Sequence, residues 1–517
     1  LFRSCLRDNF LNNFISFSYG VLVLPNIIRE TDSICPICLK RIKADIRDFG
    51  RQIIMEKQCQ EHGFFSEILS DDAEYYKRLQ RLDQIAENSV EKIKNKDKGC
   101  PYDCGLCQDH LTPSIFVNID LTNRCNMNCP VCFASAGATK RIYEPSFENI
   151  KKILERMASI KPNPPFAVQF SGGEPTLRDD LPQIIETAKK LGISQIQIAT
   201  NGKRFAKDPE FLEKVIKAGI NTYYLQFDGL CPSSYKKFRG YDTFPEKKKA
   251  IENLRSLGET SIVLVPTVSK GINDQELGEL IYFGRDNFDV VRGINFQPLS
   301  FSGRASQEEI KKYRITITDL VKLIEAQTNG EIGKEDFYPI PFVVPVSMFV
   351  ESLKGISMPH FTTHPQCGVA TYVFVESGKL IPITRFVDVE GFFEYIKERN
   401  ESIKCGGKIR KGIEISRILK DMSSFIDKEK MPKDLNLLEI TKGVLNGGGK
   451  EYLAKLHHKS LFIGTMHFMD PFNFDLDRVK RCAIHYALPD GSFIPFCSYN
   501  SIHRANIEKK LTTPINE

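Results

Sequence analysis

The sequence predicts an α/β fold in which six parallel strands alternate with helices, flanked on both sides by cysteine-containing segments. Two observations lead to this prediction. Six apolar strand-like runs follow one another between residues 115 and 297, and the intervals between them show helical periodicity. This alternation of strands and helices ends at about residue 330. Six βα units in succession imply right-handed crossovers, and therefore either an open doubly wound sheet or a partial barrel.

Length and composition bound the organisation of the chain. At 517 residues it is too long for one core, and we expect segments 1–98, 99–112, 113–330 and 331–517. A net charge of +6 from 71 basic and 65 acidic residues, without a basic block, predicts no nucleic-acid partner. Fifteen cysteines without a convincing signal peptide favour metal ligands in the cytoplasm over disulfides. Polar residues interrupt the apolar stretch 10–28, so no membrane span is predicted.

The first segment contains a candidate metal site. Its potential ligands are Cys35, Cys38, Cys59 and His62, in a short β-rich stretch. The C-x2-C and C-x2-H spacings are typical of a four-coordinate site, and three thiolates with one imidazole suit zinc or a mononuclear, rubredoxin-like iron. We expect a structural role or a point of electron entry.

Two identical cysteine spacings surround the first predicted strand, residues 115–121. The first comprises Cys100, Cys104 and Cys107, and the second comprises Cys125, Cys129 and Cys132. Three thiolates at this spacing can hold three irons of a cubane and leave the fourth open to another ligand. The second set follows the strand, so it lies at the carboxyl-terminal rim, where the chemistry of parallel α/β folds takes place. The first set precedes the strand and fits an auxiliary site, with no local fourth ligand except His110. Zinc is the alternative for both.

Polar motifs end the next three strands, predicted at 167–171, 194–200 and 222–228. The second strand leads into Gly172, Gly173 and Glu174. Glycines let the backbone approach a ligand closely, and a glutamate can accept hydrogen bonds from an ammonium group. The third strand ends at Thr200 and Asn201, and the fourth at Gln226 and Asp228, although Asp228 could simply cap the next turn. The last strands are predicted at 261–268 and 291–297.

At this point the chain resembles the radical S-adenosylmethionine (SAM) superfamily. The resemblance implies a partial six-unit (β/α) barrel, with an N-terminal metal-knuckle domain and a C-terminal α+β iron–sulfur domain. It implies a [4Fe–4S] cluster on Cys125, Cys129 and Cys132 that binds SAM, together with one or two auxiliary clusters. It also implies catalytic importance for Glu174 and a cofactor site. The expected cofactor-binding residues are Phe133, Gly172, Gly173, Glu174, Thr200, Asn201, Gln226, Asp228, Thr267, Val268 and Gln297.

The last segment supplies further cysteines. A predicted hairpin around Pro489-Asp490-Gly491 would bring Cys482 close to Cys497, and Cys367 is the expected third ligand. Cys405 and Cys231 are interpreted as ligands or free thiols. Two apolar or aromatic stretches, 337–349 and 467–475, are either core or part of a substrate wall.

The combination of the N-terminal knuckle, the tandem cysteine motifs and the C-terminal His467-Phe-Met-Asp-Pro-Phe-Asn473 and Pro495-Phe-Cys497 motifs resembles the archaeal tetraether lipid synthases. That family was formerly described as class D radical methylases. The resemblance implies 5′-deoxyadenosyl radical chemistry that joins terminal methyl carbons of phytanyl chains in archaeal diether phospholipids, giving macrocyclic archaeol and tetraether lipids. It also implies a ferredoxin-like electron donor and a cytoplasmic enzyme in peripheral contact with the membrane.

Two other functions remain open at this stage. The first is a radical methylase that acts on a pterin or a similar cofactor precursor and takes its carbon from a reduced folate-like donor. The second is an iron–sulfur electron carrier or scaffold, which leaves Glu174 and its glycines unexplained. A buried polar pocket would favour the pterin. A continuous apolar channel reaching Cys132 and Glu174 would favour the lipid.

Overall fold

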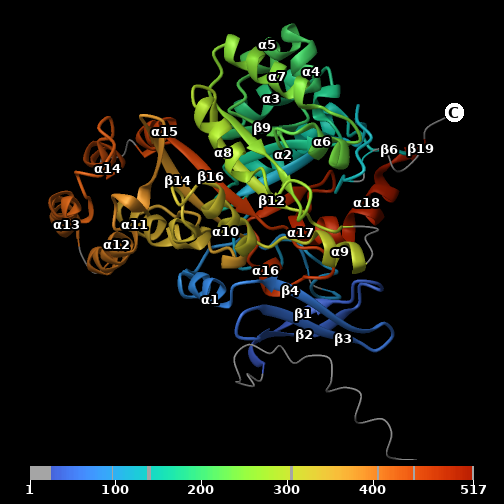
Figure 1. Cartoon of the computed structure of the whole chain (residues 1–517), viewed down its shortest axis with the longest axis horizontal. Helices are drawn as coiled ribbons and strands as arrows, with labels where there is room; N and C mark the ends of the chain where they lie inside the picture. The colour runs from blue at the N-terminus through green and yellow to red at the C-terminus, as the bar shows by residue number, and fades with distance from the viewer. Residues whose placement is uncertain are drawn as a thin grey trace, which may run out of the picture.

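The computed structural model describes residues 25–95, 97–134, 136, 141–302, 307–404, 407–445 and 449–514. Figure 1 shows a small antiparallel sheet at one end of the molecule, a large sheet with helices packed on it, and a group of late helices (orange) to one side. Cys405, one of the predicted thiols, lies outside the described residues.

The N-terminal sheet is a four-stranded antiparallel meander. It consists of β1 (Asn26–Ile34), β2 (Arg41–Asp48), β3 (Ile53–Cys59) and β4 (Gly63–Ser70), followed by helix α1 (Ala73–Arg81). The side chain of Asp72 caps α1 by accepting a hydrogen bond from the Tyr75 amide. Both turns that carry the predicted metal ligands lie at the same end of this sheet, because β1 ends before Cys35 and β3 ends at Cys59.

Buried charges hold this sheet against the rest of the protein. Arg314, with 2% of its side chain exposed, pairs with Glu67 of β4 at 2.8 Å and with Asp470 at 2.6 Å. The buried Lys57 ammonium donates to the carbonyl of Pro471 at 2.8 Å. Because removing one partner of a buried pair is costly, these contacts fix the position of the N-terminal sheet.

The large sheet contains the six predicted parallel strands in chain order. They are β5 (Phe116–Thr122), β7 (Ala167–Gly172), β8 (Gln195–Thr200), β9 (Thr222–Gln226), β10 (Ile262–Val265) and β12 (Val291–Pro298). A doubly wound sheet would reverse its order at a switch point. The uninterrupted order therefore confirms the partial barrel and excludes the alternative that the sequence had left open.

Helices connect these strands and cover one face of the sheet. They are α2 (Phe147–Ser159), α3 (Leu181–Lys190), α4 (Lys203–Lys207), α5 (Pro209–Ala218), α6 (Pro232–Arg239), α7 (Phe244–Ser256) and α8 (Leu277–Asp286). The run predicted as one strand at 261–268 is two strands, β10 and the short β11 (Thr267–Val268). Pro266 separates them, because it lacks the N–H that a continuous ladder requires.

Strands from the segment after residue 330 extend both edges of this sheet. On one edge β16 (Ser460–Met466) pairs parallel with β12, and β14 (Gly368–Glu376) pairs antiparallel with β16. On the other edge β17 (Ile484–Ala487) pairs parallel with β5 and forms the predicted hairpin with β18 (Phe493–Pro495). The boundary at 330 stays a prediction, but the sheet itself continues across it.

The late helices follow or flank these strands. They are α9 (Gln307–Tyr313), α10 (Ile317–Gln327), α11 (Val344–Lys354), α12 (Val389–Lys404), α13 (Lys408–Asp421), α14 (Leu437–Leu445), α15 (Gly449–Lys459), α16 (Leu476–Lys480), α17 (Phe496–Ser498) and α18 (Arg504–Leu511). Short strands complete the sheets: β13 (Tyr338–Pro339) and β15 (Lys379–Pro382) beside β14, and β6 (Arg141–Ile142) paired with β19 (Thr513–Pro514).

The two faces of the parallel strands differ in chemistry. On one face residues such as Val117, Phe170 and Leu225 pack with the covering helices in the main hydrophobic core. Since side chains alternate along a strand, their neighbours project into the barrel. We call this second set the inner face. Most of its members are polar: Asn118, Asp120, Gln169, Ser171, Gln195, Gln197, Thr222, Tyr224, Gln226, Asn295 and Gln297.

Candidate active site at the barrel rim

The predicted cluster ligands follow β5 on a loop at the carboxyl-terminal rim. Cys125, Cys129 and Cys132 are each partly buried. Burial, with smaller contributions from the neighbouring Glu174, Cys129 and Cys132, raises the pKa of Cys125 to about 11. A positively charged iron centre at this place would stabilise the thiolate form of these side chains. The residues present therefore fit a cluster at this place, and the ligand assignment stays a prediction.

The two glycines after β7 bring two chain segments together. Gly172 has φ of +125°, and a Cβ there would lie 2.2 Å from the Thr122 carbonyl oxygen. A Cβ on Gly173 would lie 2.3 Å from the Arg124 carbonyl oxygen. The Gly173 amide donates to Thr122 at 2.7 Å. The glycines were expected to let a ligand approach, and what they admit here is the start of the cysteine loop itself.

Glu174 is 1% exposed and joins the ends of two strands. Its carboxylate accepts hydrogen bonds from the Thr176 amide at 3.1 Å and the Thr176 hydroxyl at 2.5 Å. It also accepts from the Thr200 hydroxyl and the Asn201 amide, both at 2.7 Å. Glu174 therefore shapes the rim through contacts within the protein, and its expected contact with the methionine amine stays a prediction.

Asp228 is fully buried, and its partner is a residue that the sequence did not reveal. Arg239, the last residue of α6, binds both of its carboxylate oxygens at 2.7 Å. The same guanidinium donates to the Val131 carbonyl, inside the cysteine loop, at 3.0 Å and to the Thr267 hydroxyl at 3.0 Å. Arg239 is one of 71 basic residues, and no pattern along the chain distinguishes it. Its position beside the sulfurs depends on the folding of α6 against the loop.

The Arg239 guanidinium also acts on the cluster ligands through its charge. Burial raises the pKa of Cys129, and the neighbouring Arg239 partly offsets this effect. Arg239 is held near the sulfurs because Asp228 pairs with it and because the Val131 amide donates to the Phe238 carbonyl at 3.2 Å. The ion pair thus fastens the cysteine loop to α6 and places a positive charge beside the candidate cluster.

The other polar residues at the rim belong to one hydrogen-bonded group. The Gln226 side chain accepts from the buried Lys247 ammonium at 2.7 Å and donates to Asp228. Lys247 also donates to the Asn201 carbonyl. The side-chain Nδ2 atom of Asn201 donates to the Oδ1 atom of Asn126, within the cysteine loop, at 2.8 Å. Gln226, Asp228 and Asn201 are therefore brought together as predicted candidates, with part of their bonding capacity already used.

Of the cofactor-binding residues predicted on the last two strands, one lies in an unexpected place. Thr267 and Gln297 pair in register and are partly exposed. Val268 has no exposed surface and packs in the main hydrophobic core. Because alternate residues face opposite sides of a strand, Val268 cannot share the inner face with Thr267. Only its backbone is left to contact a cofactor.

An aromatic stack joins the cysteine loop to the C-terminal segment. Phe133, which is 40% exposed, stacks on Phe496 with 5.5 Å between ring centroids. Phe496 also stacks on Tyr486 at 5.3 Å. Buried Arg504 lies over the Tyr486 ring and pairs with Asp120 of β5 at 2.9 Å. The C-terminal segment is therefore part of the wall beside the candidate cofactor site.

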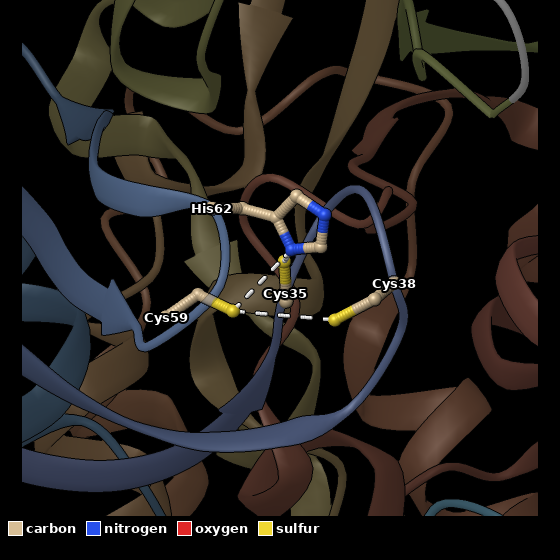
Figure 2. Close-up of side chains that lie close together, drawn as sticks. All are labelled: Cys35, Cys38, Cys59 and His62. Carbon is tan, nitrogen blue, oxygen red and sulfur yellow. Dashed lines mark hydrogen bonds between the residues drawn. The ribbon is translucent and has the colours of Figure 1, made fainter.

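The N-terminal ligands form a compact group (Figure 2). The ligand atoms of Cys35, Cys38, Cys59 and His62 all lie within 4.8 Å of one another. The His62 Nδ1 atom is 3.6 Å from the Cys35 sulfur and 3.5 Å from the Cys59 sulfur. Among the described residues no other group of metal-binding side chains is as tight. Ligands of a cubane bind different irons and need not converge on one point, so a single ion suits this group.

The auxiliary cysteines lie next to this N-terminal site. Cys100 and Cys104 are buried, with their sulfurs 3.6 Å apart, and they share a hydrophobic cluster with Ile34, the residue before Cys35. The Tyr102 hydroxyl donates to the Leu39 carbonyl at 3.2 Å, which joins the two cysteine loops.

Cys107 and the neighbouring histidine complete this loop. Cys107 is also buried, and ionisation of Cys107 would raise the pKa of Cys104 still further. His110 was the possible local fourth ligand, but its Nε2 atom is 2.9 Å from the Cys482 carbonyl oxygen. That contact occupies Nε2 and leaves Nδ1 as the ring nitrogen that could bind a metal, so the ligand role of His110 stays a prediction.

Two of the three late cysteines, Cys367 and Cys497, lie beside the buried Arg478. Burial raises the pKa of Cys482, and the neighbouring Cys497 and Cys367 raise it further. Burial also raises the pKa of Cys497 to about 11, against an opposing effect of Arg478. Cys231 lies on the surface at the start of α6. The hairpin thus brings Cys482 and Cys497 near Cys367, and their role as ligands stays a prediction.

The stretches 337–349 and 467–475, which the sequence allowed to be either core or substrate wall, consist mostly of core residues. Phe337 is fully buried in the main core, and Phe349 is 2% exposed between late helices. In the second stretch Met469 and Phe474 pack in the cluster that also contains Cys100 and Cys104. His467 is buried, which lowers its pKa to about 3.

Comparisons with known proteins agree with the barrel and the N-terminal site. The profile of the radical SAM superfamily matches residues 119–283, and that of the "HMPTM N-terminal zinc ribbon domain" matches residues 27–71. The chain is 48% identical to 7,8-dihydro-6-hydroxymethylpterin dimethyltransferase of Methanocaldococcus jannaschii, over 95% of this chain and 96% of the relative.

Other matches are partial. A GTP 3′,8-cyclase of Mannheimia succiniciproducens is 31% identical over 35% of this chain and 52% of the cyclase. The solved structure of Streptococcus suis SuiB bound to S-adenosylmethionine is 19% identical; the match covers 43% of this chain and 48% of SuiB and has a TM-score of 0.35.

These findings correct the expectation of a tetraether lipid synthase. The relative that matches almost end to end is named for a pterin, and the predicted coupling of phytanyl chains is therefore wrong. The diether lipid substrate is unsupported for the same reason, and no contact within the described residues supports the expected membrane association. No helix in the described part of the chain is long and apolar enough to cross a membrane.

Proposed function

The chain belongs to the radical SAM family that includes the M. jannaschii 7,8-dihydro-6-hydroxymethylpterin dimethyltransferase, and we propose that it methylates a reduced pterin. The proposal agrees with the second of the functions that the sequence left open.

The polar inner face of the barrel is the observation that carries this proposal. A lipid tail would need apolar side chains along its path, because burying unpaired polar groups against it is costly. The inner face instead presents carboxamide groups at Asn118, Gln169 and Gln197 and a phenol at Tyr224. These groups can form hydrogen bonds with the ring nitrogens, carbonyl and amino group of a pterin.

Radical SAM enzymes use SAM and a [4Fe–4S] cluster, which together supply radical chemistry at carbon. In this chain Cys125, Cys129 and Cys132 would hold the cluster. Glu174 and its hydrogen-bonding partners set the shape of the rim where SAM would bind. Phe133 and its aromatic neighbours would form the wall of the cofactor site on the side next to the loop.

Such enzymes also need an electron donor. We infer a small ferredoxin-like protein as that donor. The N-terminal metal site and the Cys100 loop lie side by side, which suits electron entry from that end if the bound metal is iron. If the metal is zinc, the site is structural.

The test is an anaerobic incubation of the reconstituted protein with 7,8-dihydro-6-hydroxymethylpterin, SAM, a reductant and a reduced folate that carries a methylene group. The folate is included as the carbon donor, because the SAM that is cleaved to 5′-deoxyadenosine supplies the radical and not the added carbon. We expect the pterin to gain the mass of one methylene for each methyl group added. The matched control carries Cys125→Ala, Cys129→Ala and Cys132→Ala, and we expect it to form neither 5′-deoxyadenosine nor methylated pterin. Rapid SAM cleavage with an unchanged pterin mass would overturn the proposal.

A further inference from the structure

Three carboxamide side chains stand side by side on adjacent strands of the inner face. Asn118 of β5 pairs in register with Gln169 of β7, and Gln169 pairs with Gln197 of β8. The residues that flank them, such as Val168 and Ile196, pack in the core on the opposite face. Strands lie about 4.8 Å apart, so the row spans about 10 Å. We call these three residues the amide row.

The amide row has hydrogen-bonding capacity that the described residues do not use. The Gln169 Nε2 atom donates to the Asn118 Oδ1 atom at 2.9 Å, which fixes the two side chains relative to each other. The Gln169 Oε1 atom has no partner among the described residues. Gln197 is partly buried and forms no side-chain hydrogen bond with any described residue. Polar groups in such places are normally satisfied by protein, water or a ligand.

The chemistry of a carboxamide limits what this row would recognise. Each amide offers an acceptor and a donor in one plane, which matches a ring edge that carries a carbonyl or ring nitrogen beside an amino group. The row carries no charge. The nearest inner-face carboxylate, Asp120, is already bound by Ser171 and Arg504. A neutral heterocycle therefore fits better than a cation or an anion.

The row also lies in a suitable place. Asn118 is four residues before Thr122, where β5 ends and the cysteine loop begins. Four residues of strand span about 13 Å, so the row lies below the rim. A ring held by its edge in the row would lie inside the barrel, on the amino-terminal side of the cysteine loop.

From this arrangement we propose that the amide row binds the edge of the pterin that carries its carbonyl and amino groups, with Gln169 and Gln197 as the main specificity-determining residues. This inference rests on the proposed function, because it assigns the part of the site that selects the pterin.

The experiment measures binding of 7,8-dihydro-6-hydroxymethylpterin to the reconstituted, SAM-loaded protein by anaerobic fluorescence titration. Gln197→Met and Gln169→Met keep the side-chain length but remove the amide. We expect each to raise the pterin Kd about tenfold or more, the loss of one bidentate contact. The control is Gln183→Met, on the exposed face of α3, which should leave the Kd unchanged. SAM cleavage without pterin should be the same in all four proteins, which shows that each is folded.

The outcomes distinguish failure of the amide-row proposal from failure of the proposed function. If the unaltered protein binds and methylates the pterin but both Met variants bind it within about twofold of that protein, the amide row is not the site and the proposed function survives. If the unaltered protein cleaves SAM but neither binds nor methylates the pterin, the proposed function fails and the inference fails with it. If one Met variant does not fold, the other still decides.

Discussion

Replacing Arg239 by glutamine should damage both the fold and the candidate cluster. Arg239→Gln leaves the carboxylate of Asp228 without its bidentate partner in a fully buried position. It also removes the donor to the Val131 carbonyl in the cysteine loop. The change acts on a residue that no sequence motif indicates, so it tests the tertiary arrangement directly.

The expected magnitude follows from burial. Asp228 is 0% exposed and Arg239 is 10% exposed in their side chains. Removing one partner of a buried ion pair costs about 3–5 kcal/mol, because the remaining charge stays out of water. The matched control is Arg255→Gln, which breaks a bidentate pair with Asp289 whose side chains are 38% and 55% exposed. A surface pair of this kind contributes less than about 1 kcal/mol.

The assay is anaerobic urea unfolding followed by circular dichroism, together with iron content per chain. Arg239→Gln should lower the unfolding free energy by several times the control value and should bind less iron. Adding Asp228→Asn to Arg239→Gln should recover part of the loss, because no unpaired charge is then buried. If Arg239→Gln and Arg255→Gln have equal effects on stability and iron content, the role of this ion pair in holding the loop is refuted.

Three further predictions concern the rim, a buried lysine and the N-terminal site. Gly173→Ala places a Cβ 2.3 Å from the Arg124 carbonyl and should reduce cluster iron, measured per chain, whereas Gly412→Ala, with no atom within 4 Å, should not. Burial lowers the pKa of Lys247 from 10.5 to about 8. Between these pH values the folded protein holds fewer protons than the unfolded chain, so the unfolding free energy should rise with pH by up to about 1.4 kcal/mol per unit. Lys247→Met should lack this rise, and an equal rise in the variant would contradict the assignment. Cys38→Ser should remove one zinc or mononuclear iron per chain, measured by metal analysis, and should leave the iron at the rim in place.

Local patterns predicted much of the fold. The six strands and the hairpin at Pro489-Asp490-Gly491 were predictable because the alternation of apolar residues and the turn residues act over a few positions. The N-terminal metal group was predictable because its ligand spacing reports a local geometry. The break at Pro266 was missed, although proline itself was the available signal.

The substrate was the hardest property to predict from the sequence. The residues expected to bind SAM lie in short motifs shared across a large superfamily, and such motifs do not distinguish one substrate from another. The side chains that we propose to select a pterin are single residues on separate strands, Gln169 and Gln197. They form one surface only after the strands pair in register.

The sequence by itself determined the fold class, the cysteine sets and the order of the strand-end motifs, because these depend on spacing along the chain. Only the tertiary structure decided which residues meet. It paired Arg239 with Asp228 beside the cysteine loop, turned Val268 into the core, and used Gly172 and Gly173 for contact between chain segments. Those outcomes depend on how helices cross the sheet and on which face of a strand each side chain occupies, and residues distant in the sequence settle both through packing.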